Sequence, residues 1–245
     1  MRRKLNKMPF KVLDAPALQD DFYLNLIDWG NQNFLAVGLA SNVYLWNGDN
    51  SKVTKLCDLG LSDSVTSVGW AVKGNHFTVG TNNGEVHLWD VAKLRKVRVL
   101  HGHTNRVGSI AWNSTLLSTG SRDKTILHRD VRCSSAFVQK SQGHKQEICG
   151  LRWSPDEQQL CSGGNDNKVM IWNSRNGNNP ILKFSDHIAA VKAVAWSPHQ
   201  HGLLASGGGT ADKHIRFRNT LTGETINSVD TGSQVCNLTF GKNLN

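Results

Sequence analysis

The sequence predicts an all-β protein made of five tandem repeats, and three observations lead to this fold class. The strand that closes each repeat recurs at steps of 43, 40, 43 and 46 residues, and its copies end at Trp46, Trp89, Arg129, Trp172 and Arg218. Between the turns, apolar and polar residues alternate with the period of two that is typical of strands. No segment has the apolar stripe of an amphipathic helix.

Each repeat contains three recognisable strands in the same order. The first ends in an aromatic residue, the second in small residues, and the third in tryptophan or arginine. The first strands end at Trp29, Trp70, Trp112, Trp153 and Trp196. The second strands are LAVGLAS, FTVGTNN, LLSTGSRD, LCSGGNDN and LLASGGGTAD. After the fifth repeat, SQVCNLTF has the pattern of one more first strand.

Composition restricts the classes of function. With 245 residues, 38% of them hydrophobic, the chain can bury a large core. It has no run of eighteen apolar residues, and its start, MRRKLNKMPFK, lacks the apolar region of a secretory signal. Five cysteines without a CxxC pair suggest neither a zinc site nor a disulfide framework. We therefore expect a reducing, intracellular compartment, no cofactor and no metal.

The net charge of +9 raises the question of a nucleic-acid partner. Apart from the N-terminus and residues 93–98, the basic residues are spread thinly and without interleaved aromatic residues. Diffuse charge gives only non-specific, salt-sensitive binding. We expect no specific nucleic-acid surface and no membrane partner.

Histidines about nine residues before the aromatic residue mark the last three repeats. This spacing resembles the WD repeat, which builds a four-stranded β-propeller blade from a Gly-His to Trp-Asp unit. The resemblance implies hydrogen-bonded sets of His, Ser or Thr, Asp and Trp within each blade. Because these polar groups recur once per repeat, we interpret them as structural rather than catalytic. The matching residues are His103, Thr119 and Asp123; His144, Ser162, Asp166 and Trp172; and His187, Ser206 and Asp212, with Arg218 replacing Trp.

The fold class expected is therefore a WD-repeat β-propeller of five blades plus the first strand of a sixth. Such rings usually have seven blades, and an unclosed ring exposes an apolar face and an unpaired strand edge. We expect a truncated product or isoform, with closure as a five-blade ring as the alternative. The expected organisation is a basic, extended segment over residues 1–19 and a partial propeller over residues 20–245.

Several longer blocks carry a closer resemblance. PFKVLDAPALQDDFYLNLIDWG, CGLRWSPD, SGGNDNKVMIWN, AAVKAVAWSPHQHGLLASGGGTADKHIRF and DTGSQVCNL occur in this order. Together they closely resemble the Fizzy and Fizzy-related activators of the anaphase-promoting complex, and KVLDAP and SPHQHGLL favour the Fizzy-related branch. The resemblance implies a non-catalytic subunit of the nucleus and cytoplasm. It would recognise degron-bearing substrates and present them to subunits of that ubiquitin ligase.

The resemblance also implies site residues. The positions that match the family's KEN-box pocket are Asp28, Asn165, Asn167, Thr210 and Gln234, and Asp21 matches the acidic residue that meets the arginine of a destruction box. Asn165, Asn167 and Thr210 each fall between the second and third strands of a repeat, so we expect them on one face of the ring. Amides both donate and accept hydrogen bonds, which suits a peptide.

Each of these residues has a plainer interpretation. Asparagine tolerates turn conformations and could serve the turns alone, and Asp21 could lie in a solvated turn. His199 and His201 form an HxH pair without a third metal ligand nearby. The family's ligase-docking elements are not seen in this sequence, and a generic WD-repeat scaffold, a decoy isoform and a hydrolase stay open as alternative functions.

Overall fold

The computed structural model describes residues 8–9, 11–133, 137–175 and 177–241. In these residues it contains twenty strands and no helix, so it has no helix that could span a membrane. The strands form five four-stranded antiparallel sheets, which we call blades 1 to 5. The predicted all-β fold with five blades is confirmed.

The four strands of each blade follow one another in the chain. Blade 1 contains β1 (Ile27–Trp29), β2 (Phe34–Leu39), β3 (Asn42–Asn47) and β4 (Val53–Asp58). Blade 2 contains β5 (Val65–Trp70), β6 (His76–Thr81), β7 (Val86–Asp90) and β8 (Arg95–Leu100). Blade 3 contains β9 (Val107–Trp112), β10 (Leu116–Ser121), β11 (Thr125–Asp130) and β12 (Gln139–Gln142). Blade 4 contains β13 (Ile148–Trp153), β14 (Gln159–Gly164), β15 (Val169–Asn173) and β16 (Leu182–Phe184). Blade 5 contains β17 (Val191–Trp196), β18 (Leu203–Gly208), β19 (His214–Asn219) and β20 (Glu224–Asp230).

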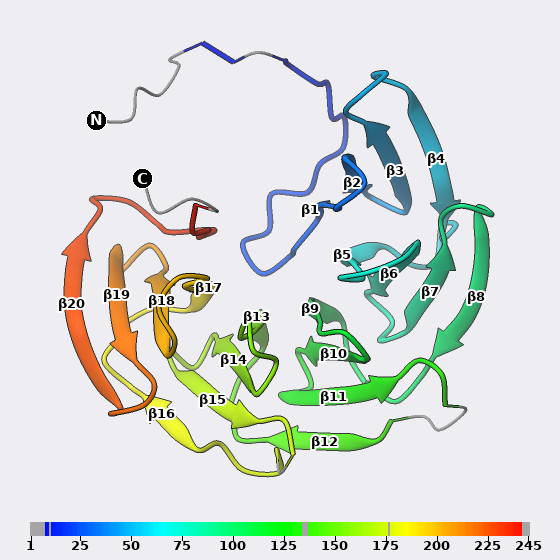
Figure 1. Cartoon of the computed structure of the whole chain (residues 1–245). Helices are drawn as coiled ribbons and strands as arrows, with labels where there is room; N and C mark the ends of the chain where they lie inside the picture. Colours follow the sequence, from blue (N-terminus) through cyan, green and yellow to red (C-terminus); the bar gives the residue numbers. More distant parts are fainter. Residues whose placement is uncertain (1–7, 10, 134–136, 176, 242–245) are drawn as a thin grey trace.

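The blades are arranged around a central axis, with the first strand of each blade innermost (Figure 1). Blades 1 to 5 follow one another around this axis, and the ring is open between blade 5 and blade 1. The chain before β1 turns into the middle of the ring before it joins blade 1. Residues 13–17 line a cavity of about 600 Å³ on the face of blade 1 together with residues of β2 and β3. The predicted boundary between the extended segment, residues 1–19, and the propeller, residues 20–245, stays a prediction.

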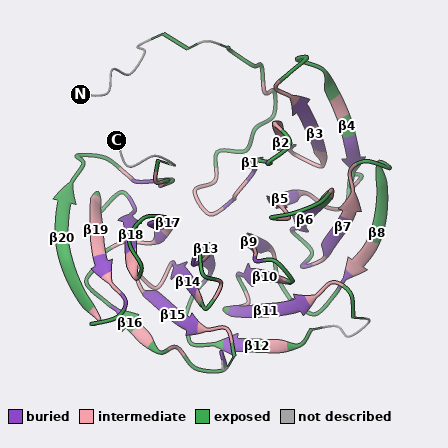
Figure 2. Ribbon diagram, in the orientation of Figure 1, coloured by how far each residue is buried: buried purple, intermediate pink, exposed green. Residues whose placement is uncertain are grey.

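Apolar side chains from adjacent blades form the core. Val43 and Leu45 of blade 1 pack in one cluster with Val65 and Phe77 of blade 2, and each of the four is at most 2% exposed. Burying a side chain of this size contributes about 1.5–3 kcal/mol. Burial decreases toward the outer strands, and β20 is exposed along its whole length (Figure 2). The blades are therefore held to one another mainly near the axis.

Close packing between blades depends on a glycine in the second strand. A Cβ atom on Gly163 would lie 2.3 Å from the carbonyl oxygen of Val191, the first residue of the next inner strand. A Cβ atom on Gly207 would lie 2.3 Å from Cγ1 of Val235. Val235 is buried, and its N–H donates to the carbonyl oxygen of Gly208 at 3.1 Å. The predicted sixth inner strand, SQVCNLTF, is thus not assigned as a strand, but Val235 takes the inner-strand position against blade 5.

The predicted set of four residues in blade 4 forms as expected. His144 lies 2.9 Å from Asp166 through Nδ1 and 2.7 Å from the Ser162 hydroxyl through Nε2. The carboxylate has no proton to donate, so the neutral imidazole keeps its hydrogen on Nδ1 and accepts from Ser162 through Nε2. Trp172 Nε1 donates to the same hydroxyl at 2.8 Å. The His144 and Asp166 side chains are 0% and 4% exposed, which argues against a hydrolase built on them.

Arginine replaces tryptophan in blades 3 and 5 and bonds to the equivalent hydroxyl. In blade 3, His103 contacts Asp123 and Thr119 at 2.8 Å each, and Arg129 Nη1 donates to Thr119 at 2.6 Å. In blade 5, His187 lies 2.5 Å from Asp212 and 2.8 Å from Ser206, and Arg218 Nε donates to Ser206 at 3.1 Å. Each of the three predicted histidine sets therefore forms hydrogen bonds within its own blade.

Candidate functional site

Two turns carry the polar residues that the sequence predicts to lie on one face. Residues 165–168 connect β14 to β15 in blade 4, and residues 209–213 connect β18 to β19 in blade 5. Asn165 and Asn167 lie in the first turn and Thr210 in the second. Because both turns link second to third strands of adjacent blades, they emerge on the same face, which we call the turn face.

The backbone at Asn167 tests the plainer interpretation of this residue as a turn former. Asn167 has a φ of 63°, in the left-handed region. Lys124 and Lys213 at the equivalent positions of blades 3 and 5 have φ values of 73° and 57°. The turn therefore forms without asparagine, although asparagine adopts this conformation more readily than lysine. The backbone N–H of Asn167 donates to the carbonyl oxygen of Gly164 at 3.2 Å, whereas its partly exposed side-chain amide has no hydrogen-bond partner among the described residues.

The amide of Asn165 is held by two side chains rather than by its own turn. Its Nδ2 donates to Oε1 of Gln146 at 2.7 Å. Its Oδ1 accepts from the hydroxyl of Tyr23 at 2.8 Å, although Tyr23 precedes blade 1 in the chain. Asn165 is thus turned neither into its blade nor onto the local backbone.

Thr210 and Gln234 lie together. The Thr210 hydroxyl donates to Oε1 of Gln234 at 2.5 Å, and Nε2 of Gln234 donates to the sulfur of Cys236 at 3.2 Å. This contact links the turn of blade 5 to the segment that follows β20. Two of the predicted site residues are therefore brought into direct contact, although they are distant in sequence.

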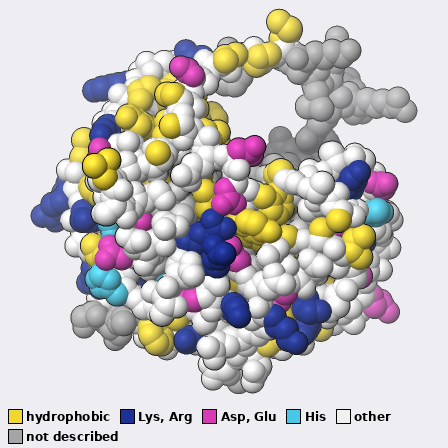
Figure 3. Space-filling view, turned by 180° about the vertical axis from the view of Figure 1, so that it is seen from behind, with side chains coloured by type: hydrophobic (Ala, Val, Ile, Leu, Met, Phe, Trp, Pro, Cys, Tyr) yellow, Lys and Arg dark blue, Asp and Glu magenta, His cyan; other side chains and the backbone are white. Residues whose placement is uncertain are grey.

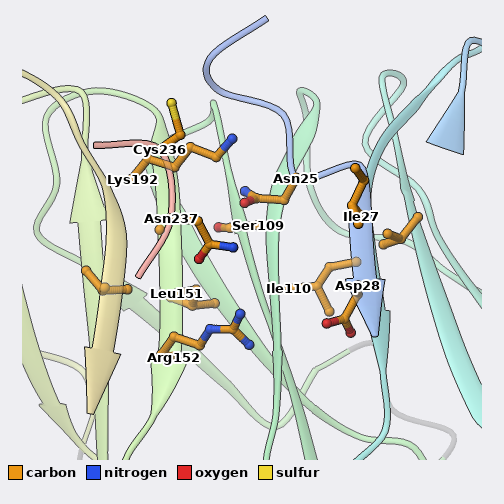
Figure 4. A pocket seen from close by; sticks show the side chains of 13 residues that line it. Asn25, Ile27, Asp28, Ser109, Ile110, Leu151, Arg152, Lys192, Cys236 and Asn237 are labelled. Atoms are coloured by element: carbon orange, nitrogen blue, oxygen red, sulfur yellow. The ribbon is translucent and has the colours of Figure 1, made fainter. Parts of the chain in front are cut away.

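Asp28 lies apart from the turn face, on the wall of a cavity of about 60 Å³ in the middle of the ring (Figure 4). Asp28 and Arg152 are at one end of this cavity, and Lys192 and Cys236 are at the other. The carboxylate of Asp28 accepts from the backbone N–H of Trp70 at 2.8 Å. Burial raises the pKa of Asp28, although the Trp70 N–H and the charge of Arg152 act in the opposite direction.

The separation of Asp28 from Asn165 follows from strand geometry. Tyr23 contacts Asn165, and Asp28 comes five residues later in the chain. Tyr23 ends a turn, and the chain after it runs extended into β1. An extended chain advances about 3.3 Å per residue, so Asp28 lies on the order of 13 Å beyond Leu24. The carboxylate of Asp28 therefore lines the central cavity, while Asn165 and Asn167 lie on the turn face. That these residues together bind one KEN-box peptide stays a prediction.

Asp21 forms an ion pair that the sequence does not predict. Its Oδ2 accepts from Nη1 of Arg106 at 2.7 Å, and its Oδ1 accepts from the backbone N–H of Tyr23 at 2.8 Å. Arg106 directly precedes blade 3, so Asp21 points across the ring rather than into a groove beside blade 1. Burial alone would raise the pKa of Asp21, but the Tyr23 N–H and Arg106 lower it overall.

Glu147 completes this cluster from blade 4. It accepts two hydrogen bonds from Arg106, at 2.7 Å from Nε and 2.9 Å from Nη2. The Arg106 side chain is 14% exposed, Glu147 6% and Asp21 32%. The hydrogen bonds to Glu147 raise the pKa of Arg106 most, and the hydrogen bond to Asp21 raises it further. Burial acts in the opposite direction but is the smaller effect. Glu147 is therefore the buried member of this cluster, Arg106 is mostly buried, and Asp21 is the most accessible.

A signal for Arg106 and Glu147 was present in the sequence. Both occupy the position immediately before the first strand of their repeat, three residues after His103 and His144. Opposite charges at one position of consecutive repeats indicate a contact between neighbouring blades, because adjacent inner strands begin side by side. Tyr23 had no such signal, since it lies outside the repeating pattern.

The two histidines of the HxH pair form hydrogen bonds within the molecule. His199 Nε2 bonds to the carbonyl oxygen of Gly241 at 2.8 Å, and His201 Nε2 bonds to Asp156 at 3.0 Å. Over the described residues, no group of three or more His, Cys, Asp or Glu side chains is arranged to hold a metal ion.

The face opposite to that of Figure 1 carries Lys and Arg in separate groups, with Asp and Glu among them (Figure 3).

Comparison with known proteins gives consistent results. The family model of the CDC20/Fizzy WD40 domain matches residues 13–245. The B-type cell cycle switch protein ccs52A of Medicago truncatula is 61% identical over 243 residues, covering 99% of this chain and 51% of that protein. Protein FIZZY-RELATED 2 of Arabidopsis thaliana is 61% identical over 243 residues, covering 99% of this chain and 50% of that protein.

A third relative and a solved structure extend the comparison. The anaphase-promoting complex subunit cdh1 of Dictyostelium discoideum is 51% identical over 276 residues, covering 100% of this chain and 37% of that protein. A chain in the crystal structure of a mitotic checkpoint complex superimposes with a TM-score of 0.94 at 49% identity, covering 96% of this chain and 72% of that chain. The chain spans about half the length of the curated plant relatives it matches.

Proposed function

Because the chain belongs to the CDC20/Fizzy WD40 family, we propose that it recognises degron peptides of substrate proteins for the anaphase-promoting complex in cell-cycle control. The names of the relatives support this role: one is a cell cycle switch protein and another is a subunit of that complex. The proposed partners are degron-bearing substrates and subunits of the ubiquitin ligase. The proposed location is the nucleus and cytoplasm.

The observation that carries the proposal is the group of amides and hydroxyls on the turn face. Asn165 and Asn167 from blade 4 lie in the turn equivalent to that of Thr210 in blade 5, and Gln234 contacts Thr210. Side chains of this kind both donate and accept, so they complement the asparagine and the exposed backbone of a KEN-box peptide. The role in recognition is binding alone, without a chemical step.

The two aspartates have separate proposed roles. Asp28 on the central cavity would attract the lysine of a KEN box, and Asp21 would meet the arginine of a destruction box. Both motifs are short, and a net hydrogen bond contributes only about 0.5–1.5 kcal/mol. Affinity for a single motif is therefore expected near the micromolar range, about 8 kcal/mol. Stable retention of a substrate would need several motifs together.

Titration with a fluorescent KEN-box peptide tests this function. Asn167→Ala is expected to weaken binding by at least about fivefold, which corresponds to about 1 kcal/mol. Lys124→Ala is the matched control, because it introduces alanine at the same left-handed turn position of blade 3. Equal affinities for Asn167→Ala and the wild type would favour a generic WD-repeat scaffold over peptide recognition at this face.

A decoy that binds degrons without activating the ligase is the second candidate function. The chain spans about half the length of the plant relatives, so docking on the ligase is tested separately from peptide binding. Co-purification with the ligase separates the two functions. Peptide binding without co-purification would identify a decoy, and co-purification with stimulated ubiquitination would identify an activator.

A further inference from the structure

The chain just before blade 1 lies across the middle of the ring and reaches blades 3, 4 and 5. We call residues 21–25 the crossing segment. Asn25 Nδ2 donates to the carbonyl oxygens of Gly108 at 2.6 Å and Cys149 at 2.9 Å. Lys192 of blade 5 donates to the carbonyl oxygen of Leu24 at 2.7 Å. In Figure 1 this part of the chain is the loop that enters the centre of the ring before β1.

The crossing segment occupies polar groups of the turn face. Tyr23 donates its hydroxyl hydrogen to Oδ1 of Asn165, while Nδ2 of Asn165 is held by Gln146. Both ends of this amide are therefore engaged within the molecule. A peptide that pairs with Oδ1 of Asn165 has to compete with the Tyr23 hydroxyl.

The same segment also occupies Asp21. Arg106 holds one carboxylate oxygen, and the N–H of Tyr23 holds the other. Arg106 therefore takes the position that the guanidinium of an arginine-bearing peptide would take. Arg106 donates two hydrogen bonds to Glu147 and one to Asp21. It therefore keeps Glu147 as its charge partner when Asp21 turns away.

We propose that the crossing segment contains an internal competitor: Tyr23 covers Asn165, Arg106 pairs with Asp21, and both contacts are broken when a degron peptide binds. This inference rests on the proposed peptide recognition by that face. The movable groups are the side chains at the start of the segment, because Asp21 is 32% exposed whereas Glu147 is 6% exposed. Leu24, which follows them, is 5% exposed and stays packed in the core. The Arg106–Glu147 pair stays in place and marks the position that Asp21 leaves. Binding of a peptide is thereby weakened by the contacts that must be broken first.

Peptide titration of two phenylalanine variants tests the competitor. Tyr23→Phe removes the hydroxyl that caps Asn165 and is expected to bind a KEN-box peptide about three- to tenfold more tightly than the wild type. Tyr44→Phe makes the same chemical change in β3 of blade 1 and is expected to leave the affinity unchanged. An affinity of Tyr23→Phe equal to or lower than that of the wild type would overturn the proposal.

Two further measurements distinguish a failure of this inference from a failure of the proposed function on which it rests. Asn165→Ala should weaken peptide binding; if it does so while Tyr23→Phe behaves as the wild type, only the competitor is overturned. If no variant binds peptide at millimolar concentration, both the function and the competitor are overturned. Hydrogen exchange gives an independent readout: saturating peptide should accelerate exchange of the Tyr23 amide, whose N–H is held by Asp21, and unchanged exchange contradicts displacement.

Discussion

The carboxylate of Asp186 receives two hydrogen bonds from the guanidinium of Arg218, at 2.7 and 3.0 Å. In blade 4 the equivalent positions hold Gly143 and Trp172, and a Cβ atom on Gly143 would lie 2.9 Å from the Trp172 ring. In blade 4, tryptophan therefore leaves room only for glycine before the blade's histidine, whereas in blade 5 the arginine has a charge partner there; in blade 3, Arg129 has Gly102 at this position. The two substitutions in blade 5 belong together.

Exchanging this pair for that of blade 4 tests the coupling. Asp186→Gly is expected to lower the free energy of unfolding by about 2 kcal/mol, because it leaves the fully buried Arg218 without its carboxylate. This is below the range for fully buried pairs, because the Asp186 side chain is 39% exposed. Arg218→Trp alone should also destabilise, since its ring meets Asp186. In urea unfolding, the double variant should lose less free energy of unfolding than the two single variants lose in sum. If the two losses simply add, the coupling is contradicted.

A second prediction concerns the cluster that joins blades 3 and 4. Arg106→Leu leaves Glu147 buried without its two hydrogen-bond donors, so we expect a loss of about 3 kcal/mol in the free energy of unfolding. The same substitution at Arg132, whose side chain is 72% exposed in its pair with Asp130, should lower the free energy of unfolding far less, because water screens an exposed pair.

Adding Glu147→Gln to the Arg106 variant provides the control for charge. It removes the uncompensated carboxylate, so part of the lost stability should return in the same urea titration. If the single Arg106 variant is as stable as the Arg132 variant, the cluster does not hold the two blades together.

The repeats allowed much of the fold to be predicted, because the same strand pattern and the same hydrogen-bonded histidine occur again and again. The histidine sets of His103, His144 and His187 formed as expected for this reason. The resemblance to the Fizzy-related branch is also confirmed at the level of the family. The assignment of individual residues to degron binding stays a prediction.

The contacts of the crossing segment could not be predicted from the sequence. Tyr23 and Asn165 are 142 positions apart, and nothing in the local pattern of either residue indicates the other. Asp21 and Asp28 are close in sequence, but a turn at residues 22–23 separates them, and one contacts Arg106 while the other contacts Trp70. Only the arrangement of the blades around the axis determines which of these groups meet.

Two buried histidines predict how stability depends on pH. Burial lowers the pKa of His187 to about 4, with Asp212 opposing the shift, and burial together with the charge of Arg129 lowers the pKa of His128 to about 4. An exposed histidine in the unfolded chain titrates near about 6.5. As the pH falls from about 6.5 to 4, the unfolded state therefore takes up protons that the folded state does not bind.

The free energy of unfolding should accordingly decrease on acidification, with each of these histidines contributing a slope of about 1.4 kcal/mol per pH unit inside that window. Asp212, whose pKa is lowered to about 2, contributes a further loss of stability only below the pH window in which the histidines titrate. Urea titrations at pH 5 and pH 6 measure the slope. His128→Gln should reduce it by about one histidine's share, with the exposed-site substitution His76→Gln as control for the change of side chain. An unchanged slope in His128→Gln would show that His128 takes up a proton as readily in the folded as in the unfolded chain.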